Sequence, residues 1–239
     1  MNGDGIARGG ADGFVVDPPP QAFLPVAGGG RFPVRRVFCV GRNYAAHARE
    51  MGHDDREPPF FFTKPADAVV PGAEGAAVPF PPMSDDLHHE IELCVLIGRG
   101  GVDLAPEAVM DHLWGACVGV DLTRRDVQGA AKAKGRPWDM AKGFDASAPM
   151  APAVPLADAP PLDRGRIWLS VNGEPRQEAD LSAMIWPVRD HVAELSRHVR
   201  LAPGDVVMTG TPEGVGPVRR GDRVEGGVDG LPGVSFVVA

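Results

Sequence analysis

Apolar positions in this chain fall into short blocks separated by glycine, proline and polar residues, and this pattern predicts many short strands. The expected strands are VRRVFCVG from Val34, FFFTKP, HHEIELCVLIG, CVGVDLT, GDVVM and VSFVV. Asn172-Gly173 between the blocks IWLSV and EPRQ predicts a tight β-hairpin. Helical spacing is confined to residues 42–52, 106–114, the polar stretch after Asp121, and 187–199. Strands outnumber helices, which predicts a β-rich mixed fold rather than doubly wound βαβ units.

Composition supports this interpretation. The chain has 239 residues, with 31 glycines and 25 prolines, too many for a helix bundle, and its 44% hydrophobic content is too high for disorder. Residues 1–33 are rich in Gly, Ala and Pro and are expected to form a loosely structured N-terminal arm. Residues 34–239 are then expected to form a single compact domain.

Charge and cysteine usage narrow the expected partners and compartment. A net charge of −8 argues against a nucleic-acid partner and against an anionic membrane. No apolar run approaches the roughly 20 residues that span a bilayer, and no secretory signal is visible. Cys39, Cys94 and Cys117 lie in apolar runs without a C-x-x-C motif, which predicts reduced core thiols and a cytoplasmic location.

Two glutamates interrupt the most apolar block. Glu90 and Glu92 are two residues apart, so in a strand their side chains point to the same face, where like charges resist burial. Asp121 ends another apolar run, WGACVGVD, and three oxygen ligands suit a hard ion such as Mg²⁺ or Mn²⁺. Spacing alone leaves a second interpretation equally open: an exposed edge strand with solvated glutamates.

Other polar residues allow both a chemical and an ordinary interpretation. His47 and Glu50 share a helix face, as a water-activating pair would, although a solvated surface histidine is the commoner case. Lys142, in DMAKGFD, could stabilise enolate charge or simply be exposed. Arg125 and Gln128 would share a face with Asp121 if that stretch is helical. The glycine-rich GTPEGVG turn offers backbone N–H groups for an anion.

Seven segments in a fixed order carry a family resemblance. GRNYAAHAREMG, FFTKP, HHEIEL, GVDLTRRDVQ, KGRPWDMAKGFD, VNGEPRQ and GTPEGVGPV together resemble the fumarylacetoacetate hydrolase family in its short single-domain form. The resemblance runs from about Val34 to the C-terminus and is strongest toward fumarylpyruvate hydrolases and acylpyruvases. It implies an α+β, β-rich fold, a mixed β-sandwich or roll with short peripheral helices, and a homodimer.

The same resemblance implies roles for individual residues. The metal ligands would be Glu90, Glu92 and Asp121, holding one Mg²⁺ or Mn²⁺ per chain. The catalytic residues would be His47 and Glu50, on a segment that closes over the substrate, and Lys142. The substrate-binding residues would be Arg42, Tyr44, Arg125, Gln128 and Thr211. Lys64 is a weaker candidate for the far carboxylate of the substrate.

The expected activity is metal-dependent hydrolysis of the carbon–carbon bond of a 2,4-dioxo acid, with fumarylpyruvate giving fumarate and pyruvate in the gentisate pathway of aromatic catabolism. Three alternatives stay open at this point. An acylpyruvase or oxaloacetate decarboxylase, or an isomerase or decarboxylase of aromatic catabolism, would use the same site for another outcome. A non-catalytic small-molecule binder would not need the His47–Glu50 pair at all.

Overall fold

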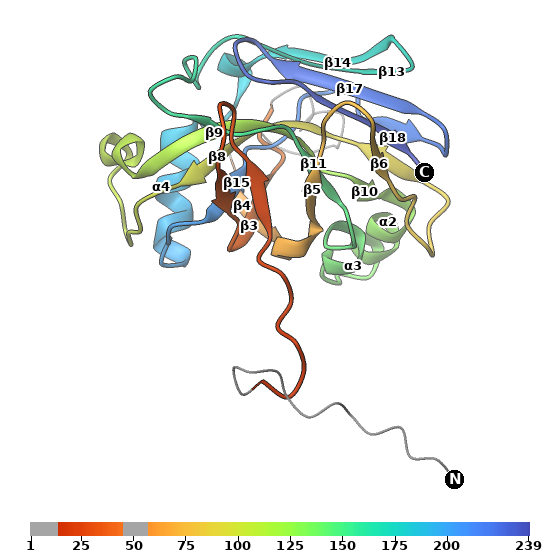
Figure 1. The fold of residues 1–239 in the computed structure, drawn as a ribbon, viewed down its shortest axis with the longest axis horizontal. Coiled ribbons are helices and arrows are strands. Elements are labelled where there is room, and N and C mark those ends of the chain that lie inside the picture. Colours follow the sequence, from red (N-terminus) through yellow and green to blue (C-terminus); the bar gives the residue numbers. More distant parts are fainter. Residues whose placement is uncertain (1–13, 45–56) are drawn as a thin grey trace.

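The computed structural model describes residues 14–44 and 57–239 of the chain. Within these residues the strands form four sheets, and the helices are few and short. The β-rich fold with peripheral helices expected from the sequence is confirmed. Figure 1 shows the two larger sheets as stacked layers, with α4 (Val188–His198) at one end and α2 (Arg125–Ala133) and α3 (Asp139–Lys142) at the other.

The largest sheet has the strand order β4-β3-β15-β8-β9-β11-β5, with β12 paired to β9. Its strands are β3 (Arg36–Gly41), β4 (Phe60–Lys64), β5 (Val69–Pro71), β8 (Ile91–Ile97), β9 (Leu113–Val120), β11 (Ala148–Met150), β12 (Val154–Pro155) and β15 (Asp205–Met208). The central pair, β8 and β9, is antiparallel. Central strands with neighbours on both sides give this sheet its rigidity and place their ends at fixed positions.

Three smaller sheets complete the fold. The five-stranded sheet has the order β14 (Glu174–Asp180), β13 (Arg166–Val171), β17 (Arg223–Val228), β18 (Val234–Val238) and β6 (Ala76–Val78). The three-stranded sheet has the order β10 (Thr123–Arg124), β7 (Leu87–His89) and β16 (Gly216–Val218). The hairpin sheet pairs β1 (Phe23–Pro25) with β2 (Arg31–Pro33), and the 3₁₀ helices are η1 (Ala66–Ala68), η2 (Pro106–His112) and η3 (Leu181–Ala183).

Both faces of β8 are buried, which explains why its sequence is almost continuously apolar. Leu93 and Val95 face a core cluster shared with the five-stranded sheet, whereas Cys94 and Leu96 face a second cluster on the opposite side. The β1–β2 hairpin closes that second cluster with buried Leu24 and Phe32, while residues 14–21 are exposed. The three cysteines are buried and free, in agreement with the sequence.

The predicted hairpin is present and has the expected turn. Asn172 and Gly173 join β13 to β14 with φ values of 55° and 81°, the left-handed conformation that a type I′ turn requires at both positions. The helix predicted after Asp121 begins at Arg125, and the helix predicted over 187–199 is α4. The helix expected over residues 42–52 falls mostly outside the described residues.

Two sequence expectations were wrong in detail. The block HHEIELCVLIG is not one strand, because the chain leaves the three-stranded sheet after His89 and enters the largest sheet at Ile91, with Glu90 at the switch. Residues 106–114 are not an α-helix, because η2 ends at His112 and Leu113 already pairs with Ile97 in the largest sheet. Among the described helices, none has the length and apolarity needed to cross a membrane.

Two glycines allow a matched test of the packing. A Cβ on Gly115, in β9, would lie 2.0 Å from the carbonyl oxygen of Val154, which is backbone and cannot rotate away. We expect Gly115→Ala to lower the free energy of unfolding by about 1–3 kcal/mol. Gly129 lies in α2 with nothing within 4 Å of its Cβ position, so Gly129→Ala should raise stability by about 0.5–1 kcal/mol. Urea denaturation measures both, and equal effects of the two substitutions would contradict this account.

A buried histidine makes the fold sensitive to acid. His191 in α4 donates Nδ1–H to the Trp186 carbonyl at 3.0 Å, and burial lowers its pKa from 6.5 to about 4. Between pH 6.5 and about 4, His191 is therefore protonated in the unfolded chain but neutral in the folded chain. The free energy of unfolding falls as the pH decreases through this range, by up to about 1.4 kcal/mol per pH unit. His191→Asn, whose amide can keep the bond to Trp186, should make this slope shallower in urea denaturation. His198→Asn, at an exposed position of the same helix, should leave the slope unchanged.

Candidate metal centre and active-site pocket

Three carboxylates meet at the ends of β8 and β9. The register pairs Ile91 with Val120, so Glu90 and Asp121 lie side by side just beyond this pair, and the Asp121 N–H donates to the Glu90 carbonyl at 2.8 Å. Glu92 is two residues into β8. Carboxylate oxygens of Glu90, Glu92 and Asp121 all lie within 4.8 Å of one another, and all three residues are buried. The edge-strand alternative with solvated glutamates is therefore wrong.

Three cationic side chains partly compensate this negative charge. Lys142 Nζ lies 2.8 Å from Glu90 Oε2 and 2.6 Å from Asp121 Oδ2. Lys64 Nζ is 2.8 Å from Asp121 Oδ1, and Arg125 donates to Glu90 Oε1. Burial alone would lower the pKa of Lys142, but Asp121 and Glu90 outweigh it and raise this pKa to about 12. Lys142 is therefore held as an ammonium ion against the two carboxylates.

Glu92 is the carboxylate with which none of these cations forms an ion pair, although the charge of Lys142 acts on it at longer range. It is 1% exposed, and within the described residues its side chain accepts one backbone N–H, from Gly210 at 2.6 Å, and makes no ion pair. Burial, followed by the charges of Asp121 and Glu90, raises the pKa of Glu92 well above its usual value. A divalent cation would offset the repulsion between the three carboxylates. Carboxylate oxygens are the ligands that Mg²⁺ and Mn²⁺ prefer. The residues present therefore fit one such ion.

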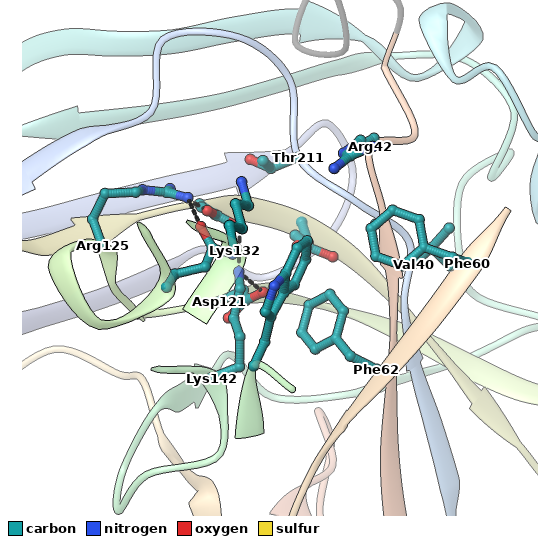
Figure 2. Close-up of a pocket in the computed structure, with 14 residues that line it drawn as sticks. Val40, Arg42, Phe60, Phe62, Asp121, Arg125, Lys132, Lys142 and Thr211 are labelled. Carbon is teal, nitrogen blue, oxygen red and sulfur yellow. Dashed lines mark hydrogen bonds and ion pairs between the residues drawn. The ribbon is translucent and has the colours of Figure 1, made fainter. Parts of the chain in front are cut away.

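A pocket opens above the carboxylates. Besides Glu90, Glu92, Asp121 and Lys142, its lining includes Arg42, Arg125, Gln128 and Thr211, four of the five residues expected to bind substrate. In Figure 2 the Thr211 and Arg42 side chains lie at the top of the view and Asp121 and Lys142 lie lower, with Lys132 between them. Phe60, Phe62 and Trp138 form an aromatic wall that the pocket shares with a neighbouring cavity of about 460 Å³.

Two neutral polar side chains of the pocket, Gln128 and Thr211, are oriented by hydrogen bonds to their neighbours. Arg125 Nη1 donates to Gln128 Oε1 at 2.7 Å, so the Gln128 NH₂ group is left facing the pocket. Gln177 of β14 accepts from the Ile91 N–H with Oε1 and donates with Nε2 to the Pro212 carbonyl and to Thr211 Oγ1, at 3.1, 2.9 and 2.8 Å. Because Thr211 Oγ1 accepts from Gln177, its own hydrogen is available to a bound molecule.

Two other expected residues, Tyr44 and Lys64, do not line the pocket. Tyr44 is buried and does not line the pocket, and burial, together with Glu92, raises its pKa. His47 and Glu50 lie outside the described residues. Lys64 was expected to reach the far carboxylate of a substrate; instead it is buried against Asp121 and the backbone carbonyls of Leu122 and Lys142.

Sequence reasoning did not single out Gln177, Lys132 or Trp138. Gln177 lies in VNGEPRQ, a segment used for the hairpin and for the family resemblance without a role for this residue, and its bonds reach residues 34 and 86 positions away. Lys132 is in the last turn of α2, where basic residues are common for electrostatic reasons alone. Tertiary packing places Lys132 and Trp138 in the pocket lining and Gln177 behind Thr211, and the local pattern around each residue does not show this.

Comparisons with known proteins support an enzymatic site. Residues 36–239 match the family model for the fumarylacetoacetate (FAA) hydrolase C-terminal region. The crystal structure of fumarylpyruvate hydrolase from Pseudomonas aeruginosa, in complex with Mn²⁺ and pyruvate, is 50% identical with a TM-score of 0.91, and the match covers 95% of this chain and 99% of that one.

Two curated relatives carry other activities in their names. Mitochondrial oxaloacetate tautomerase FAHD1 of Mus musculus is 42% identical over 204 residues, 85% of this chain and 91% of its own length. Mitochondrial oxaloacetate decarboxylase of Dictyostelium discoideum is 38% identical over 197 residues, 82% of this chain and 90% of its own. The relatives therefore share a fold while differing in the reaction that their names report.

Glu92 allows a test of the metal site that does not depend on turnover. We expect Mn²⁺ or Mg²⁺ at about 100 times its dissociation constant to stabilise the protein by about 2.7 kcal/mol, seen as a rise in Tm. Glu92→Gln should lose most of this response. Without metal, the same variant should be as stable as the wild type or more so, because it removes a buried charge that lacks a cationic partner. The exposed Glu107→Gln is the control, and a full metal response in Glu92→Gln would refute the site.

Proposed function

The chain belongs to the fumarylacetoacetate hydrolase family, and from this premise we propose that it hydrolyses the carbon–carbon bond of a 2,4-dioxo acid, converting fumarylpyruvate to fumarate and pyruvate. The observation that carries the proposal is the buried group of Glu90, Glu92 and Asp121 with Lys142 against it, at the floor of a pocket lined by hydrogen-bond donors. Such a site suits an anionic, oxygen-rich substrate.

Glu90, Glu92 and Asp121 would hold the divalent ion. When bound, that ion would act as a Lewis acid toward the carboxylate and keto oxygens at the pyruvate end of the substrate. The Gln128 NH₂ group and the Thr211 hydroxyl would donate hydrogen bonds to substrate oxygens, and Arg125 would contribute positive charge beside them. These contacts orient the bond to be cut.

The proposed reaction consumes one water. The His47–Glu50 pair takes a proton from water, and the resulting hydroxide adds to the 4-keto carbon. The tetrahedral intermediate then breaks the C3–C4 bond, releasing fumarate and the enolate of pyruvate. The Lys142 ammonium, held against Asp121 and Glu90, stabilises the enolate charge until C3 is protonated, which completes pyruvate.

A second candidate function is favoured by the names of the two relatives. Tautomerisation or decarboxylation of oxaloacetate would use the same metal and the same enolate stabilisation, but neither step adds water. A water-activating base is therefore required for hydrolysis alone. This difference separates the two functions experimentally.

We also propose a pathway, a compartment and an oligomeric state for this enzyme. We place the enzyme in the gentisate pathway of aromatic catabolism, in the cytoplasm and as a homodimer. The support is the likeness to the Pseudomonas aeruginosa enzyme and the family resemblance. Sedimentation of the purified protein measures its oligomeric state directly.

Substitution of His47 is the decisive test. With Mg²⁺ or Mn²⁺ present, the wild type should consume fumarylpyruvate faster than acetylpyruvate. The rate is measured as the loss of the enol absorbance of the dioxo acid. His47→Ala should lower kcat for hydrolysis by about 10²–10⁴-fold, while any conversion of oxaloacetate is retained. The control is His198→Ala, at an exposed position on α4. A metal-loaded wild type that leaves both dioxo acids intact would overturn the proposed function.

A further inference from the structure

Two cationic side chains line the pocket without an acidic partner. Arg42 follows β3, and Lys132 lies in the last turn of α2. In the described part of the chain neither forms an ion pair, although Glu57 acts on Arg42 at longer range, and Arg42 Nε is buried with no hydrogen-bond partner. Lys64, Lys142 and Arg125, in contrast, each contact a carboxylate of the metal site.

An aromatic pair holds these two cations in place. The Arg42 guanidinium lies over the Phe60 ring at 5.2 Å, and Lys132 Nζ lies over the Trp138 ring at 5.0 Å. Phe60 and Trp138 themselves meet edge to face, with centroids 5.4 Å apart and an interplanar angle of 83°. Figure 2 shows Arg42 near Thr211 at the top of the view, and Lys132 between Thr211 and Asp121.

The backbone at Arg42 is adapted to this arrangement. Arg42 has φ of 59°, a left-handed conformation that a residue with a long side chain rarely adopts. The preceding Gly41 leaves room for the Phe60 ring, because a Cβ at Gly41 would lie 2.0 Å from it. In this conformation the half-buried Arg42 lines the pocket.

Positive charge is crowded on this side of the pocket. Burial, followed by the charges of Arg125 and Arg42, lowers the pKa of Lys132 to about 8. Cations that repel one another in a partly buried site are stabilised when an anion binds between them. No carboxylate of the described residues forms an ion pair with Arg42 or Lys132, so a bound ligand can supply the anion between them.

We propose that Lys132, together with Arg42, binds the far carboxylate of a dicarboxylic 2,4-dioxo acid and so selects diacids over acylpyruvates. This inference rests on the proposed function, since it assigns the end of the substrate that is remote from the metal. A single ion-paired contact of this kind can separate substrates that share the same reacting end. The alternative role for Lys132 is structural, as a cover for the Trp138 ring.

The test compares two substrates that differ in the far carboxylate. Lys132→Met keeps an unbranched stem over Trp138 but removes the charge. We expect it to lower the ratio of kcat/KM for fumarylpyruvate to kcat/KM for acetylpyruvate by about 10–100-fold, mainly through the KM of fumarylpyruvate. Lys132→Arg, which restores a cation, should recover most of the ratio. Lys134→Met, two residues farther along at an exposed position, should show the wild-type ratio. A purely structural role predicts an equal effect on both substrates.

A binding measurement separates this inference from the proposed function. Calorimetric titration with fumarate and with crotonate, which lacks one carboxylate, should show that the wild type prefers fumarate and that Lys132→Met loses the preference. If the wild type hydrolyses neither dioxo acid but Lys132→Met still abolishes the preference, the proposed reaction fails and the carboxylate subsite stands. An unchanged preference in Lys132→Met would overturn the subsite, whatever the activity.

Discussion

The structure depends on the burial of three carboxylates at one point. Glu90, Glu92 and Asp121 would repel one another strongly in a poorly solvated interior, and the fold meets this with cations from separate elements. Lys64 comes from β4 at the sheet edge and Lys142 from α3, so these peripheral elements are tied electrostatically to the ends of the central strands. Glu92 is left without a cation among the described residues, and this imbalance is what makes the site receptive to a metal ion.

The scaffold explains why the carboxylates cannot move apart. β8 and β9 are buried on both faces, and the pairing of Ile91 with Val120 aligns Glu90 beside Asp121. Glu90 also marks the point where the chain passes from the three-stranded sheet into the largest one. A carboxylate at such a switch is anchored by two sheets, and small movements of either are resisted by a packed core.

Local pattern predicted the strands, the Asn172-Gly173 hairpin and helix α4, because each depends on contacts close in sequence. The meeting of Glu90 with Asp121 was also accessible, since both end apolar runs. The break at Glu90 and the strand beginning at Leu113 were not, because they arise from pairing with strands that are distant in the sequence. The positions of Lys64, Lys132 and Gln177 depend entirely on tertiary packing, and a lysine has the same local pattern whether it is exposed or buried against a carboxylate.

The neutral groups of the pocket complete its chemical selectivity. The Gln128 carbonyl oxygen accepts from Arg125 and the Thr211 oxygen accepts from Gln177, which leaves the Gln128 NH₂ group and the Thr211 hydroxyl hydrogen available to donate to a ligand. The polar atoms of a dioxo diacid in its ionised keto form are acceptors without exception. A hydrogen-bond donor on a ligand would be left unpaired if it faced the Gln128 NH₂ group or the Thr211 hydroxyl hydrogen. An unpaired buried donor costs about 1–3 kcal/mol. The donor groups on the walls therefore match the acceptor oxygens of a keto acid, whereas the negative charge of the carboxylate floor has to be met by the metal ion.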